Sequence, residues 1–78
     1  MRGQCRTLSR MGMFFQGTAL PVGQSVELSV ELPGGRFQAV GEVRYHHAYP
    51  EGQGMGIRFT RLAQEDLAVI QKFLEQHA

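Results

Sequence analysis

The sequence of 78 residues has one cysteine, no tryptophan and almost no net charge, and each shortage excludes a class of protein. Cys5 has no second cysteine to pair with, so an internal disulfide is excluded and a reducing, cytoplasmic environment is expected. A formal net charge of +1 gives no strong field that would attract nucleic acid or an anionic membrane. No apolar run approaches the roughly 20 residues needed to span a bilayer, and Met1 to Arg10 lacks the apolar core of a secretory signal.

The remaining composition is that of a folded domain. Apolar residues make up 42% of the chain and charged residues 19%, which argues against disorder. A chain of this length buries only about 60% of its unfolded surface, so it can form one core and no more. We therefore expect residues 1–78 to form a single domain.

Short alternating segments predict strands. Residues 26–32 alternate between apolar and polar side chains, which is typical of a strand with one buried face. Pro33-Gly34-Gly35 interrupts the run, and the glycines can supply the positive φ of a hairpin. A returning strand is predicted over 36–45. Its expected inward-facing side chains are Phe37, Ala39, Val43 and Tyr45.

Further strands are predicted over 11–15 and 55–59, with a fifth, less marked one over 3–8. Turn residues at 20–23 and 50–54 separate these segments. The period then changes, and a helix of roughly 13 residues is predicted from about Gln64. Its apolar stripe consists of Leu67, Val69, Ile70, Phe73 and Leu74. Because so short a helix is marginal alone, it must dock on the strands, which predicts a mainly β fold with one C-terminal helix.

The order of several motifs resembles the PilZ domain family. That family carries an Asp or Asn, any residue, Ser, two residues and then Gly, and this region reads Thr7-Leu8-Ser9-Arg10-Met11-Gly12 here. The likeness continues in Leu20-Pro21-Val22-Gly23, Leu32-Pro33-Gly34-Gly35, Gly41-Glu42-Val43-Arg44 and Gly54-Met55-Gly56-Ile57-Arg58-Phe59. It covers nearly the whole chain. The resemblance implies a small antiparallel β-barrel of the split-barrel type with a C-terminal α-helix.

The resemblance also implies a function. PilZ domains bind cyclic di-GMP, a dinucleotide with two phosphates and two guanines, and relay its presence to a protein partner. Arginine can fork onto phosphate or guanine, a serine hydroxyl can make a polar contact, and glycine lets backbone approach closely. The ligand-binding residues implied here are Arg2, Arg6, Ser9, Arg10 and Gly12.

Two departures from the family pattern leave a second function open. Thr7 stands where the family has Asp or Asn, and a hydroxyl cannot bridge two guanine donors as a carboxylate can. Arg2 and Arg6 are separated by three residues, as in the family's arginine pair, but that pair normally lies a strand upstream of the serine. We therefore expect the chain to lack the family's first strand and upstream arginines. The alternative is a degenerate domain that binds no nucleotide and pairs its open edge with a protein partner or a second copy.

Other chemistry has less support. Ser9 can equally bond its own turn, and Gly12 can equally serve close strand packing. His46 and His47 are adjacent on a strand and point to opposite faces, so no metal site is expected. No nucleophile–base pair, phosphate loop or paired carboxylates suggest an enzyme. A nucleic-acid-binding barrel would need aromatics interleaved with a basic groove, which this chain lacks.

Overall fold

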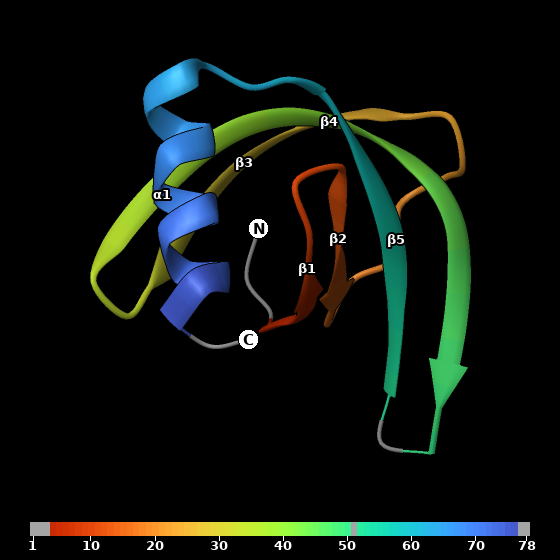
Figure 1. Ribbon diagram of the computed structural model, residues 1–78. Helices are drawn as coiled ribbons and strands as arrows, with labels where there is room; N and C mark the ends of the chain where they lie inside the picture. Colours follow the sequence, from red (N-terminus) through yellow and green to blue (C-terminus); the bar gives the residue numbers. More distant parts are fainter. Residues whose placement is uncertain (1–3, 51, 77–78) are drawn as a thin grey trace.

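In the part of the chain that the structure describes, five antiparallel strands form one curled, open sheet, and a single helix packs at one end of it (Figure 1). The computed structural model describes residues 4–50 and 52–76. The strand order is β1-β2-β5-β4-β3, so β1 and β3 form the two edges. The elements are β1 (Gln4–Leu8), β2 (Gly12–Gln16), β3 (Ser25–Leu32), β4 (Gly35–Tyr49), β5 (Gly52–Arg61) and α1 (Gln64–Gln76). The mainly β prediction and the helix prediction are confirmed.

The long strand β4 joins the two halves of the sheet. Its first half pairs with β3 across the hairpin, where Gly34 has a φ of 92°. Its second half pairs with β5, from Val40 opposite Arg61 to Tyr49 opposite Gly52. The β4–β5 register shifts at two places, between Val40 and Gly41 and between Val43 and Tyr45. Such bulges bend and twist a strand, and Figure 1 shows β4 as a long arch.

The core lies inside the curl of the sheet. Phe37, Val43, Met55 and Ile70 are fully buried there, contributed by β4, β5 and α1. Other core side chains come from the inward faces of β2, β3, β4 and β5, namely Met13, Phe15, Val26, Leu28, Ala39 and Ile57. The period-two pattern of the sequence therefore predicted the buried face of β3 and β5.

Helix α1 closes one end of the curl. Ile70 is its fully buried residue, and Val69 and Leu74 pack against the same core. The Asp66 carboxylate accepts a hydrogen bond of 2.9 Å from the Gln38 amide, which ties the first helical turn to β4. Within residues 4–50 and 52–76, no helix has the length and apolar character needed to cross a membrane.

Shortening Ile70 tests the contribution of this docking. Ile70→Val removes one buried methylene-sized group, and we expect the free energy of unfolding to fall by about 1 kcal/mol. Urea denaturation followed by circular dichroism measures the change. The exposed Lys72→Ala variant on the same helix should change stability by less than about 0.5 kcal/mol. Equal effects of the two substitutions would show that Ile70 does not anchor the helix.

Candidate ligand-binding site

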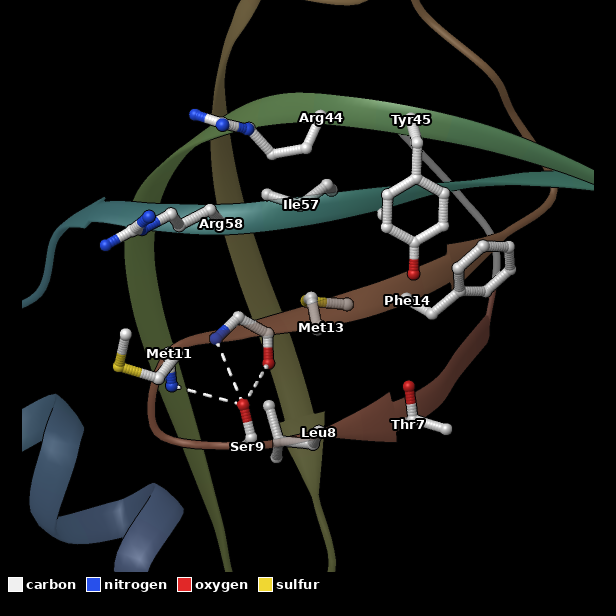
Figure 2. A pocket seen from close by; sticks show the side chains of 12 residues that line it. Thr7, Leu8, Ser9, Met11, Met13, Phe14, Arg44, Tyr45, Ile57 and Arg58 are labelled. Carbon is white, nitrogen blue, oxygen red and sulfur yellow. Dashed lines mark hydrogen bonds between the residues drawn. The ribbon is translucent and has the colours of Figure 1, made fainter.

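The turn between β1 and β2 is held by the side chain of Ser9. Its hydroxyl accepts hydrogen bonds from the Met11 and Gly12 amides at 3.2 and 3.3 Å and lies 3.4 Å from the Gly12 carbonyl, to which it donates. The Ser9 amide donates to the same carbonyl at 2.9 Å. Side-chain bonds of this local kind stabilise turns. Ser9 therefore shapes the turn, as Figure 2 shows with dashed lines.

The same turn is pressed against β5. The Phe59 amide donates to the Met11 carbonyl at 2.8 Å, and Gly12 lies opposite Arg58 in the β2–β5 register. A Cβ added at Gly12 would fall on the carbonyl oxygen of Ile57. Because that oxygen belongs to the backbone, only glycine lets the two strands approach this closely.

A pocket of about 410 Å³ opens beside this turn, on the outer face of the sheet. Four strand segments contribute to it: β1 with its turn, β2, β4 and β5. Its lining residues are Thr7, Leu8, Ser9, Met11, Gly12, Met13, Phe14, Arg44, Tyr45, Gly56, Ile57 and Arg58. Figure 2 shows that Arg44 and Arg58 extend along one side, whereas Tyr45 and Phe14 lie at the other. The pocket thus has a basic side, an aromatic side and two hydroxyl residues, Thr7 at the end of β1 and Ser9 in the turn.

The two arginines differ in their partners. Arg44 Nη1 lies 3.1 Å from a carboxylate oxygen of Glu42, two residues earlier on β4. Arg58 is exposed on β5, and no side chain within the described ranges forms a hydrogen bond or ion pair with it. Glu42 and Arg58 are directly opposite each other in the β4–β5 register. Arg44 and Arg58 therefore line the pocket with exposed side chains, and most of their guanidinium donors are available to a ligand.

Aromatic rings cover β5 on the outer face because β5 has glycines there. A Cβ at Gly56 would collide with the Tyr45 ring, and one at Gly54 would collide with the Phe14 ring. The Phe14 ring centroid lies 6.1 Å from that of Tyr45 and 5.6 Å from that of Tyr49. The Phe14 side chain is consequently buried although it points away from the core, while Tyr45 keeps 55% of its surface exposed. Tyr45 thus offers a ring face on which a planar base can stack.

Comparison with known proteins identifies the family. The model of the PilZ domain matches residues 1–76. The chain belongs to the PilZ domain family. PilZ domains are regulatory domains that in general bind cyclic di-GMP.

A solved structure shares this PilZ fold. The Bacillus subtilis inhibitor of motility (MotI/DgrA) superimposes with a TM-score of 0.83 at 20% sequence identity. The match covers 99% of this chain and 42% of that one, so this chain spans less than half the length of the Bacillus protein. No curated protein matches the sequence.

The PilZ motif residues predicted from the sequence lie in different places. Thr7, Ser9 and Gly12 line the pocket, whereas Arg10 lies in the exposed turn and outside the pocket lining. Arg6 Nη1 donates to the Gln16 side chain at 3.0 Å, and its guanidinium stacks 4.4 Å above the Tyr49 ring. Arg2 lies outside the described residues. Ligand binding by these arginines stays a prediction.

Sequence reasoning missed the aromatic and basic sides of the pocket. Tyr45 was expected to share the buried face of β4 with Val43, and this prediction is wrong, because the bulge between them turns Tyr45 to the outer face. Arg44 and Arg58 were assigned no role. The glycine at position 56 was the available signal, since a missing side chain on a paired strand leaves room for a cross-strand ring.

His46, His47 and Cys5 have local roles. His47 packs edge-on against Tyr49 at 4.7 Å, whereas His46 Nε2 lies 2.5 Å from the Leu20 carbonyl. No group of three His, Cys, Asp or Glu residues that could hold a metal ion occurs within the described ranges. Burial raises the pKa of the Cys5 thiol, so little reactive thiolate forms at neutral pH.

The glycine contact under the pocket gives a stability test. Gly12→Ala forces a Cβ into the β5 backbone, and we expect the free energy of unfolding to fall by about 2 kcal/mol. Thermal denaturation of the purified variant measures this loss. Gly35→Ala is the matched control, because its Cβ would meet only the two methyl groups of the Val69 side chain, at 3.2 and 3.9 Å, and that side chain can move. Similar losses in both variants would contradict the close β2–β5 approach.

Proposed function

We propose that this chain is a PilZ regulatory module that binds cyclic di-GMP in the outer-face pocket and relays the signal to a protein partner. The observation that carries the proposal is that Arg44, Arg58 and Tyr45 line the same pocket as the turn of the PilZ motif. A dinucleotide with charged phosphates and planar purines needs this combination of groups. The pocket volume of about 410 Å³ lies in the range of small-molecule sites.

Each side of the pocket suits one part of the nucleotide. The guanidinium groups of Arg44 and Arg58 can donate forked hydrogen bonds to phosphate oxygens or to O6 and N7 of guanine. The exposed Tyr45 ring offers a stacking surface for a base. The Thr7 hydroxyl provides a short polar contact, whereas the Ser9 hydroxyl already serves the turn. Arg44 and Arg58 thus supply, from β4 and β5, positive charge that the resemblance assigns to an upstream arginine pair.

Removing one arginine of the pocket tests the binding mode. Arg58→Gln keeps a polar side chain but removes the guanidinium group and its charge, and we expect cyclic di-GMP binding to weaken at least about tenfold. Isothermal titration calorimetry measures the dissociation constant. Arg61→Gln removes the same charge from the same strand but lies outside the pocket lining, so its affinity should stay within about twofold of the wild type. A folded wild-type protein that gives no saturable heat would refute the proposal.

A second candidate function rests on the open sheet. The edge strands β1 and β3 are not paired with each other, and a hollow of about 450 Å³ lies where they meet the helix. Cys5, Leu8, Leu32 and Phe73 contribute to its lining. An unpaired edge is a template for strand addition. A degenerate PilZ-like module would use the seam, meaning the open edges of β1 and β3 with the hollow between them, to bind a strand from a protein partner or from a second copy.

Concentration-dependent association tests the second candidate. If strands add at the seam, sedimentation velocity should show larger species as protein concentration rises. Hydrogen exchange of the β1 and β3 amides should slow at the same time, because added hydrogen bonds protect them. The β5 amides are already paired on both sides and serve as the internal control. A strictly monomeric profile with edge amides that are protected at every concentration would contradict strand addition.

A further inference from the structure

One carboxylate lies among the arginines of the pocket. Glu42 and Arg44 are two residues apart on β4, and their charged groups approach to 3.1 Å. Glu42 is also the direct cross-strand neighbour of Arg58 on β5. Residues directly opposite each other in an antiparallel pair place their side chains on the same face, close enough to interact. Glu42 is therefore next to both positive charges of the pocket without being part of its lining.

The Glu42–Arg44 pair is exchangeable. The Arg44 side chain is 55% exposed and that of Glu42 is 40% exposed, so water and salt screen their attraction. Exposed ion pairs of this kind contribute little to stability, and breaking one does not leave a buried charge. The carboxylate can thus be displaced from Arg44 by another anion without unfolding any element.

A phosphate diester and the Glu42 carboxylate need the same donors. Both groups accept hydrogen bonds from the guanidinium fork, and both carry one negative charge. A phosphate that binds Arg44 must replace the Glu42 oxygen or share the guanidinium with it. A phosphate near Arg58 also meets the like charge of the carboxylate opposite that residue.

We propose that Glu42 acts as an internal competitor that lowers the affinity of the pocket for the phosphates of cyclic di-GMP. This inference rests on the proposed function. Glu42 holds the guanidinium of Arg44 in the ligand-free protein, and the ligand must displace it. The affinity of the site then depends on how much more strongly Arg44 binds the phosphate than the Glu42 carboxylate. Removing the carboxylate charge therefore strengthens phosphate binding.

The variant Glu42→Gln tests the inference by a gain of affinity. Glutamine keeps the size of the side chain, and its neutral amide competes poorly for a guanidinium. We expect calorimetric titration with cyclic di-GMP to give a dissociation constant about three- to tenfold lower than that of the wild type. Glu75→Gln changes net charge equally but lies on α1, an element that contributes no residue to the pocket, and should leave the affinity unchanged.

A double-mutant cycle identifies the route of the effect. If Glu42 acts through Arg44, the gain in cyclic di-GMP affinity caused by Glu42→Gln should be at least threefold smaller when Arg44→Gln is also present. Circular dichroism melts of all variants establish that each one is folded.

The possible outcomes separate the two proposals. Binding by the wild type with an unchanged or lower affinity in Glu42→Gln would overturn the competitor role, and a lower affinity would make Glu42 a direct contact to the ligand. An equal gain in Glu75→Gln would also overturn that role. Failure of every folded variant to bind would overturn the proposed function and this inference with it.

Discussion

The close approach of β5 to its neighbours is the constraint on which the rest of the structure depends. Glycines at positions 12 and 41 let the backbones of β2 and β4 come near the Ile57–Arg58 segment of β5 without a side chain between them. Glycines at positions 54 and 56 then leave the outer face of β5 bare, and the rings of Phe14 and Tyr45 lie over it. The close strand contacts and the aromatic side of the pocket thus have the same cause, which is glycine at the positions where neighbouring strands touch.

Local sequence patterns predicted the elements well. The alternation in 26–32 and 55–59 reflects burial of one strand face, and the apolar stripe from Leu67 to Leu74 reflects docking of one helix face; both depend on residues close in sequence. Tyr45 could not be placed this way, because a bulge inserts one residue and reverses the alternation after it. Whether a bulge occurs depends on the partner strand, which a single segment does not reveal.

The sequence indicated only the part of the candidate site that lies in one continuous segment. The motif from Thr7 to Gly12 indicates the turn that lines the pocket, because its serine and glycine can be recognised within one short segment of sequence. Its Ser9 hydroxyl bonds the turn itself, so the motif fixes the shape of the pocket wall. Arg44 and Arg58, on the basic side of the pocket, are fourteen positions apart in sequence, and the pairing of β4 with β5 places both of them in the pocket lining. Only the three-dimensional pairing shows that they belong to the same site.

The alternation of β4 and β5 has a consequence for how this protein can change over evolutionary time. The core residue Val43 is next in sequence to the pocket residue Arg44, yet Val43 is fully buried and Arg44 is exposed on the outer side of the sheet. Substitutions at Arg44, Tyr45 and Arg58 change exposed side chains that are not part of the buried core. Ligand preference can therefore diverge between relatives while the inherited architecture stays constant, and residue identity in the family should persist longest at the strand-contact glycines.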